Sequence, residues 1–381
     1  MCENHNTVVS VIIPTFNVEK YVEQCLRSLL EQTFCEFEVI CVDDGSSDDT
    51  IEIIKRIQAE DDRICLIEKE HCGRAGVMRN IGLEEAKGQY CLFLDADDFF
   101  EKEMIGRVLE KMREDQADIC LFDARLYNEK TKKYKDIDYI LQKDYLPETL
   151  PFEGKSFPYI FNVTSGCPWS KMFKKSLIDT EQIRFMDLPR SNDVYFVFLA
   201  MVLAKRITAV RQVFVNYRQS GESLQANNAR SPWNWYEALK ELKEELIRRD
   251  LYKETQNSFK NLVLGVSIYN LCSLKSAQAF SEVYEKLREE VFEEFGLEDF
   301  RKEQCYSYNE KKYEIYCDIC RYDVKEYMFR EVMGLKEERS YWLKRAKKAE
   351  QELKGIKEST TFKLGQSVLA VPRKLKKMIK H

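Results

Sequence analysis

The sequence predicts an α/β fold, with a mainly parallel sheet flanked by helices and an α-helical region after it. Short β-rich runs alternate with segments of helical apolar spacing between Val8 and Phe122, as in right-handed βαβ units. Acidic clusters follow two of these runs directly, at the strand ends where open α/β sheets bind ligands. After about Ala226 there are few strand signals, and helical spacing dominates.

Strands in the first part are predicted where short apolar or β-branched runs are bounded by turn residues, at 8–14, 37–42, 64–67, 89–94 and 119–122. Helices are predicted between them, at 18–32, 49–60 and 101–115, and the segment 73–88 is predicted to supply a loop and a helix. The apolar positions of the first helix show the spacing: Val22, Cys25, Leu26, Leu29 and Leu30.

The later part of the chain changes character. The segment 127–158 is rich in Lys, Asp and Tyr, and is predicted to be a loop or hairpin over the sheet. A helix at 194–204 and an alternating strand at 210–218 follow. Further helices are predicted at 233–245, 252–274 and 277–295, and a long charged, coiled-coil-like helix at 326–356. The predicted domains are an α/β domain at 1–226, a helical extension at 227–325 and a charged helix with a basic tail at 326–381.

The composition is that of a soluble globular protein. The 381 residues are 44% hydrophobic and 33% charged, and the net charge of −5 argues against nucleic-acid binding. Thirteen cysteines without framework spacing, and no signal-peptide pattern, favour a reducing cytoplasm. The CxxC pair Cys317 and Cys320 lacks a second pair and is interpreted as one helix face rather than a zinc or redox site. No stretch approaches the ~20 apolar residues that span a bilayer.

The segment from Tyr90 to Phe99, YCLFLDADDF, organises the prediction of function. A buried strand ends there in three carboxylates, Asp95, Asp97 and Asp98, whose like charges require a cation or water. On a continuing strand Asp95 and Asp97 would project on the same side. Hard oxygen ligands beside a phosphate suit Mg²⁺ or Mn²⁺, so an Asp-x-Asp (DxD) metal site is one interpretation. An acidic turn after a strand is the other.

The turns after the first two strands offer groups that a nucleotide needs. Phe16 could stack on a base, or it could be a core residue. Asp43 and Asp44 could accept hydrogen bonds from a nucleoside, or they could cap the next helix. No Walker loop and no GxGxxG motif occurs, which weighs against NTPases and dinucleotide enzymes.

Two segments, VSVIIPTFNVEKYVEQCLRSLLEQTFCEFEVICVDDGSSDDT and RNIGLEEAKGQYCLFLDADD, closely resemble the family 2 glycosyltransferases. The resemblance is dense from Val8 to Phe100 and readable to about Ala226. It implies a GT-A fold for the α/β domain and transfer of a sugar from a nucleotide-diphosphate donor, expected to be a UDP-sugar. It also implies a bacterial enzyme of the cell-envelope or capsular polysaccharide type.

The resemblance implies a donor site and a metal site. Donor contacts are expected from Pro14, Phe16, Asp43, Asp44, Arg79, Asp95 and Ala96. Asp97, assisted by Asp95, would hold Mg²⁺ or Mn²⁺ and neutralise the departing diphosphate, while Asp98 is expected to hold the loop. Arg79 matches the family's loop arginine, which meets the nucleotide or the diphosphate; Met78 stands where the family usually has Ala.

On the acceptor side the family commonly has an acidic pair at the start of a helix. Asp193 fits the general-base position, although it could instead be a helix cap, and Asn192 replaces the usual first carboxylate. Trp169 and Lys171 resemble the acceptor-side W-x-K segment, in which the tryptophan offers a sugar ring an apolar platform. Acceptor contacts are therefore expected from Trp169, Lys171 and Asn192. The downstream Tyr217, Arg218 and Ser223 resemble a YR…S element near the diphosphate, or a plain strand end.

The predicted function is an inverting, metal-dependent glycosyltransferase that adds a sugar to a glycan or lipid-linked acceptor in cell-envelope polysaccharide synthesis. A catalytically silent sugar-binding or scaffold protein on the same fold is the alternative, supported by the Asn192 departure. A nucleotidyltransferase would need a glycine-rich basic loop where this chain has the PTFN turn. A homodimer is left open.

The C-terminal tail reverses the charge balance of the chain. Between Lys357 and His381 there are seven Lys or Arg residues and one Glu, with apolar residues recurring every three or four positions. This pattern predicts a basic amphipathic helix that docks the enzyme on the anionic inner face of the plasma membrane. An ordinary charged helix packed on its own domain or on a partner is the alternative.

Overall fold

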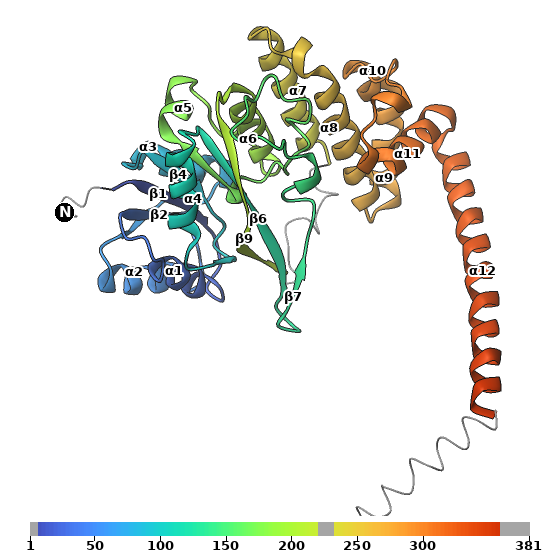
Figure 1. The fold of residues 1–381 in the computed structure, drawn as a ribbon, viewed down its shortest axis with the longest axis horizontal. Coiled ribbons are helices and arrows are strands. Elements are labelled where there is room, and N and C mark those ends of the chain that lie inside the picture. Colours follow the sequence, from blue (N-terminus) through green and yellow to red (C-terminus); the bar gives the residue numbers. More distant parts are fainter. Residues whose placement is uncertain (1–6, 220–231, 359–381) are drawn as a thin grey trace, which may run out of the picture. The chain divides into compact units, whose positions relative to one another are not determined.

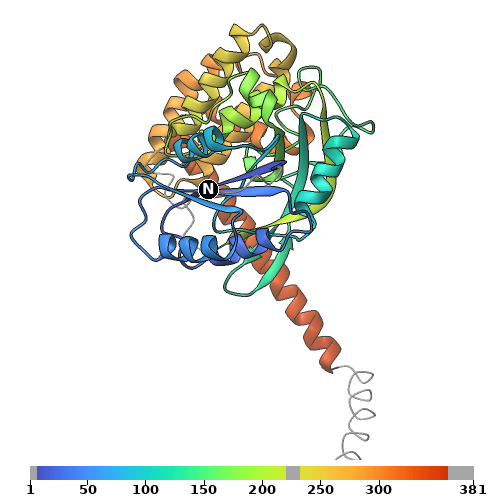
Figure 2. The ribbon, with the colours of Figure 1, turned by 90° about the vertical axis from the view of Figure 1, so that its left-hand side faces the viewer.

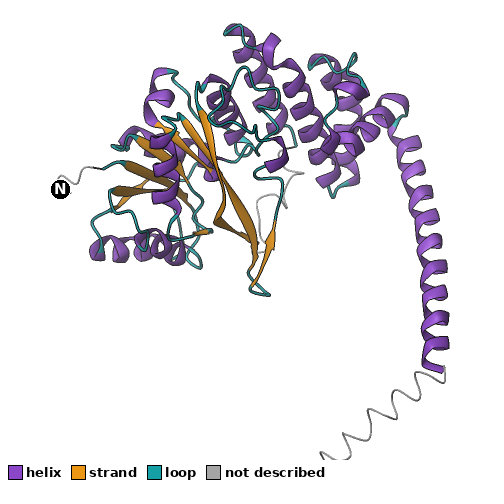
Figure 3. Ribbon diagram, in the orientation of Figure 1, coloured by secondary structure: helices purple, strands orange, loops and turns teal. Residues whose placement is uncertain are grey.

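The computed structural model describes residues 7–219 and 232–358. The chain divides into two compact units, residues 1–317 and 318–381. The predicted boundary at 226/227, the position of Ser223 and the tail at 359–381 lie outside the described residues. Figure 1 gives the labels used below, and Figure 3 shows that strands are confined to the first unit of the described chain.

The first unit is built on one sheet with the strand order β3-β2-β1-β4-β8-β6-β9-β5, and β7 pairs with β6 outside this path. The strands are β1 (Val9–Thr15), β2 (Phe37–Asp43), β3 (Ile64–Glu68), β4 (Tyr90–Phe93), β5 (Phe99–Phe100), β6 (Ile119–Asn128), β7 (Lys133–Asp136), β8 (Lys171–Lys174) and β9 (Ile207–Gln219).

The first four long strands pair as predicted, but the sheet as a whole is mixed. β1 pairs in parallel with β2 and β4, and β2 with β3, as βαβ units require. β8 then inserts antiparallel between β4 and β6, and β5 pairs antiparallel with β9. The expectation of a mainly parallel sheet is corrected in this half, because β5, β7 and β8 pair antiparallel with their neighbours while β6 and β9 pair in parallel.

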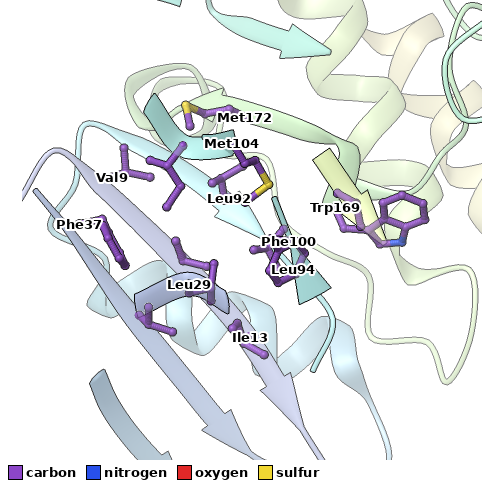
Figure 4. Packing of buried hydrophobic residues seen from close by; sticks show 14 of the residues in the cluster. Val9, Ile13, Leu29, Phe37, Leu92, Leu94, Phe100, Met104, Trp169 and Met172 are labelled. Carbon is purple, nitrogen blue, oxygen red and sulfur yellow. The ribbon is translucent and has the colours of Figure 1, made fainter. Parts of the chain in front are cut away.

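Helices cover both faces of the parallel strands. They are α1 (Val22–Leu30), α2 (Thr50–Glu60), α3 (Ala75–Glu85), α4 (Met104–Glu114), α5 (Lys175–Thr180) and α6 (Asn192–Leu203). Val9, Val11 and Ile13 of β1 pack in one core cluster with residues of α1, α2 and α4. Ile12 points to the other face, where α3 lies so close that a Cβ on Gly82 would be 2.5 Å from Ile12 Cγ2. Figure 2 shows the strands between the α1–α2 pair and α3, and Figure 4 shows part of the core.

The helical extension follows β9. It consists of α7 (Asn234–Arg248), α8 (Tyr252–Ser273), α9 (Ala277–Lys286), a π-helical turn (Leu287–Val291), α10 (Phe292–Glu294) and α11 (Glu310–Arg321). α11 was not predicted, and it contains the CxxC pair, which therefore lies on a helix as expected. The described part of the second unit is dominated by α12 (Val324–Glu358). Among the described helices, none combines the length and the apolar character needed to cross a membrane.

Candidate active site

The carboxyl ends of β1, β2 and β4 lie at one edge of the sheet, because these strands are parallel and adjacent. Phe16 directly follows β1 and Asp44 directly follows β2, while Asp95 lies two residues after the end of β4. Pro14 lies within β1, opposite Val42 of β2. The sequence-predicted donor residues are thus brought to the edge where α/β sheets bind ligands.

The loop at residues 71–73 contacts both Phe16 and Asp44. The sequence did not single out this loop. The Phe16 side chain is 42% exposed, and the His71 ring stacks on it with centroids 4.2 Å apart and planes 18° apart. Asp44 Oδ1 and Oδ2 accept hydrogen bonds from the N–H groups of Cys72 and Gly73, at 2.7 and 2.8 Å. His71 Nδ1 lies 2.9 Å from the main-chain oxygen of Asp44. An aromatic face and a carboxylate therefore lie together, the pair of groups that a planar base with an N–H donor requires.

Asp43 is buried and organises the turn after β2. Its Oδ2 accepts from Thr15 Oγ1 at 2.8 Å and from Ser46 Oγ at 2.7 Å, and its Oδ1 accepts from Ser46 N at 2.7 Å. These bonds tie the ends of β1 and β2 together. The contact of Asp43 with a ribose stays a prediction.

The acidic segment after β4 is a turn and not a continuing strand. β4 ends at Phe93, and Asp98 N donates to Asp95 O at 3.3 Å around the buried Ala96. The expectation that Asp95 and Asp97 project alike from an extended strand is therefore wrong. Asp98 is fully buried, and its Oδ1 accepts from Arg218 N at 2.8 Å, so it holds the loop as expected.

Arg218 holds this acidic turn in place through hydrogen bonds. Its Nε donates to the main-chain oxygen of Asp97 at 2.6 Å, its Nη2 donates to Gln24 Oε1 at 2.7 Å, and its Nη1 pairs with Glu129. The guanidinium also lies over three rings, Tyr21, Phe99 and Tyr127, at 4.9, 5.2 and 5.4 Å from their centroids. A buried arginine so fully engaged positions the turn rather than offering a free cation.

Asp97 and Asp95 differ in their neighbours. Burial, and then the charge of Asp95, raise the pKa of Asp97 from 3.8 to about 6. The Asp97 carboxylate forms no ion pair with any described residue, whereas Asp95 Oδ1 lies 2.6 Å from Arg79 Nη2. Desolvated, mutually repelling hard oxygens fit Mg²⁺ or Mn²⁺. No group of three or more His, Cys, Asp and Glu side chains suited to a metal occurs among the described residues, so further oxygen ligands would come from water or the donor phosphates.

Arg79 links the donor side of the site to α6. It is 6% exposed, and besides its pair with Asp95 it donates from Nη1 to Asn192 Oδ1 at 3.1 Å. Its guanidinium also lies 5.4 Å from the Phe185 ring centroid. The two polar partners come from segments almost 100 residues apart, so one cation fixes their relative position. Contact between Arg79 and a nucleotide or diphosphate stays a prediction.

Asp193 lies in the first turn of α6, directly after Asn192. The chain enters this helix through Ser191, which has a left-handed φ of 55°. Asn192 Nδ2 donates back to Leu188 O at 3.3 Å, which closes this entry. Burial raises the pKa of the Asp193 carboxyl, and the nearby Arg79 opposes that shift. A carboxylate with a raised pKa beside the donor edge suits a general base.

Gly76 allows α3 to approach the start of α6. A Cβ at this position would lie 2.6 Å from Met186 O and 2.9 Å from Asn192 Cβ, which real side chains do not tolerate. The missing side chain therefore permits the Arg79–Asn192 hydrogen bond.

Trp169 and Lys171, the expected acceptor residues, are both buried. Trp169 is 6% exposed and stacks on Tyr217, with centroids 5.4 Å apart. Lys171 is fully buried, and its Nζ donates to Ser165 O, Cys167 O and Ser170 Oγ at 2.9, 2.8 and 3.1 Å. Burial lowers the pKa of Lys171 to about 8. These two residues hold the loop beside Asp193, and their contact with an acceptor stays a prediction.

Comparison with known proteins identifies the family. The model of glycosyl transferase family 2 matches residues 10–180. GlyG, a glycosyltransferase of Streptococcus pneumoniae, is 27% identical over 231 residues, covering 59% of this chain and 75% of GlyG. TuaG of Bacillus subtilis, named as a glycosyltransferase of teichuronic acid biosynthesis, is 30% identical over 246 residues, covering 63% of this chain and 91% of TuaG.

The fold has a solved counterpart in residues 1–349 of Staphylococcus aureus TarS, crystallised with UDP-GlcNAc. The TM-score is 0.64 at 22% identity, and the match covers 83% of this chain and 91% of that one. The likeness shows that the mixed sheet with its flanking helices is the GT-A fold. Because the chain covers nearly all of a relative at 30% identity, and because the family model spans the segments that contain Phe16, Asp44 and Asp97, it belongs to glycosyl transferase family 2 and is a glycosyltransferase.

Proposed function

We propose that this glycosyltransferase is metal-dependent and inverting, and that it transfers a sugar from a UDP-sugar to a hydroxyl group of a glycan or lipid-linked acceptor. The observation that carries the proposal is the Arg79 bridge. One buried guanidinium holds Asp95 at 2.6 Å and Asn192, the neighbour of Asp193, at 3.1 Å. The bridge gives the metal-binding turn and the proposed base a fixed separation.

On the donor side, the nucleobase of the UDP-sugar would stack on Phe16 and donate an N–H to Asp44. His71 would either move away from the Phe16 ring or add its own ring to the stack. Asp97, assisted by Asp95, would hold Mg²⁺ or Mn²⁺. When bound, such an ion neutralises the negative charge that develops on the departing diphosphate.

On the acceptor side, Asp193 would accept the proton of the attacking hydroxyl. The acceptor oxygen then bonds to the anomeric carbon as the bond from that carbon to the diphosphate breaks. A single displacement with one carboxylate base inverts the anomeric configuration. Arg79 and Gly76 would serve this step by holding the start of α6 in place.

The relatives support a role in cell-envelope polysaccharide synthesis. TuaG is named for teichuronic acid biosynthesis, and the similar TarS is named as a poly(ribitol-phosphate) β-N-acetylglucosaminyltransferase. The chain spans only 45% of TarS in that comparison, so the acceptor of this chain is assigned no further than an envelope glycan.

The test is transfer from a panel of UDP- and GDP-sugars, measured with Mn²⁺, with Mg²⁺ and with chelator. We expect a UDP-sugar to be used or slowly hydrolysed only in the presence of a metal ion. Full activity in chelator would refute metal dependence. The NMR coupling constant of the anomeric proton in the product then reports whether the configuration has inverted.

Asp193→Asn tests the base separately. We expect a loss of about 10²–10⁴-fold in turnover, with UDP-sugar affinity changed only a few-fold, because a general base acts on the acceptor and not on the donor. Normal transfer by this variant would show that the base lies elsewhere. Donor binding by the wild type without transfer to any acceptor would instead favour a silent sugar-binding protein.

A further inference from the structure

The helix α12 carries a continuous heptad seam. Residues spaced alternately by four and three positions fall on one side of it: Met328, Val332, Leu335, Arg339, Trp342, Ala346, Ala349 and Leu353. Seven of the eight are apolar, and the series spans more than three heptads. A strict repeat of this kind keeps one stripe facing a partner along the whole length of a helix, and is typical of a coiled coil.

The large side chains of this seam are exposed in the single chain. Met328, Val332, Leu335, Trp342 and Leu353 have between 44% and 63% of their surface accessible. Among the described residues of α12, nine large apolar side chains are exposed; five of them lie on the seam, and Phe329 and Leu343 flank it at e positions. A partner helix that covered the seam would remove these side chains from water.

The charges beside the seam are arranged for a second copy of the same helix in parallel. With Val332, Arg339, Ala346 and Leu353 at the a positions, the g positions are Glu331, Glu338, Arg345 and Glu352, and the e positions include Lys336, Leu343 and Glu350. In a parallel pair each g residue faces the e residue five positions later on the other helix. Glu331 then meets Lys336, and Arg345 meets Glu350. Glu338 faces the apolar Leu343, so no like charges are opposed among these pairs.

The polar position in the seam fits the same arrangement. Arg339 at an a position adjoins the preceding g residue of the other helix, Glu338. A single polar residue at an a position fixes register and favours one oligomeric state. Val332 at a and Leu335 at d are the choice that favours two strands.

We infer that α12 is a dimerisation helix, which pairs in parallel with the α12 of a second copy of this chain to form a two-stranded coiled coil. The inference does not depend on the proposed reaction, because it rests on the second unit alone.

The test is the mass of the full chain in solution, measured by sedimentation equilibrium over a dilution series. We expect twice the monomer mass of 45.1 kDa. Trp342→Glu and Leu335→Glu should each weaken the dimer by roughly 100-fold or more, because each places a carboxylate in both halves of an apolar contact. Each has a neighbouring exposed control that lies off the seam, Tyr341→Glu and Met333→Glu, which should leave the mass unchanged.

A charge exchange tests the parallel orientation. Glu331→Lys alone and Lys336→Glu alone each oppose like charges twice in a parallel homodimer, whereas a mixture of the two variants restores both attractive pairs. We expect each variant to dimerise weakly alone and the mixture to form a heterodimer. A monomer at all concentrations, controls as damaging as the seam variants, or no recovery in the mixture would overturn the inference.

Discussion

Lys171 provides a sharp test of the site, because its burial has a measurable consequence. The ammonium group has no exposed surface and donates to Ser165 O, Cys167 O and Ser170 Oγ. Burial lowers the pKa of Lys171 from 10.5 to about 8, since the charged form loses its hydration. Lys171→Met removes this titrating group while keeping an unbranched apolar chain of similar length.

The magnitude follows from proton linkage. Below pH 8 the lysine is protonated in both states, so the folded protein carries the full cost of a buried charge. Between pH 8 and 10.5 the unfolded chain binds one more proton than the folded chain, so stability rises with pH. With the pKa lowered from 10.5 to about 8, the gain is about 3 kcal/mol. Above pH 10.5 the cost is gone.

The assay is urea denaturation of the wild type and Lys171→Met at a series of pH values from 7 upward. Groups common to both proteins cancel in the difference between their free energies of unfolding. At pH 7 the variant leaves three oxygen acceptors without a donor, and each costs about 1–3 kcal/mol, partly offset by removal of the buried charge. As the pH approaches 10.5, we expect the stability advantage of the wild type to grow by about 3 kcal/mol.

Lys174→Met is the matched control, because Lys174 lies in the same strand with a side chain that is 44% exposed. Its stability difference from the wild type should be nearly independent of pH. A difference that stays flat for Lys171→Met would refute the reasoning. It would mean that water reaches the ammonium group. Such access would be needed if Lys171 contacted the acceptor substrate directly.

Three further predictions concern the acidic turn after β4, the contact between α3 and α6, and the tail. Asp97→Asn should abolish transfer, and in the absence of metal it should raise the free energy of unfolding at pH 7 by about 3 kcal/mol, because it removes a carboxyl whose pKa is raised from 3.8 to about 6. Denaturation below pH 4, where this carboxyl is protonated, should show no such gain in stability. Gly76→Ala should lower kcat at least tenfold with little change in donor KM, because its Cβ would displace Asn192, whereas Gly106→Ala, which meets only ordinary contacts, should be neutral in the same kinetics. A chain ending at Lys357 should lose salt-sensitive co-sedimentation with anionic liposomes, and equal binding by both chains would contradict membrane docking by the tail.

The parts of the fold with local signals were predictable from the sequence. β1, β2 and β4 combine apolar runs with polar residues directly after them, and the structure confirms each strand within two residues at either end. β8 was missed because its four residues are fixed by pairing with β4 and β6, which lie far away in the chain. β6 continues six residues beyond its prediction, since bulges near Asp123 carry the pairing with β9 past an acidic residue.

The limits in the site have the same origin. Sequence patterns placed Asp97, Asp193 and Arg79 in a site, but they carry no information on which side chains neutralise one another. Arg79 finds its partners 16 and 113 residues away. His71 was given no role, because its contact with Phe16 depends on a loop that bonds to Asp44. Side-chain chemistry was predictable, whereas pairing across the chain required the structure.

The amide at Asn192 has a consequence for the acidity at which the enzyme works. A carboxylate in its place would stand next to Asp193 and raise the pKa of this proposed base further, because two adjacent negative charges repel. The neutral side chain of Asn192 does not raise the pKa of Asp193 in this way. The positive charge of Arg79 then acts on Asp95, with which it pairs, and on Asp193, whose pKa it lowers. We therefore expect the wild type to remain active at lower pH than the Asn192→Asp variant. In the pH–rate profile of the variant, the fall in rate on the acidic side should begin at higher pH. With Asp193 in its proposed role, the departure from the family pattern would extend the pH range of activity toward acid.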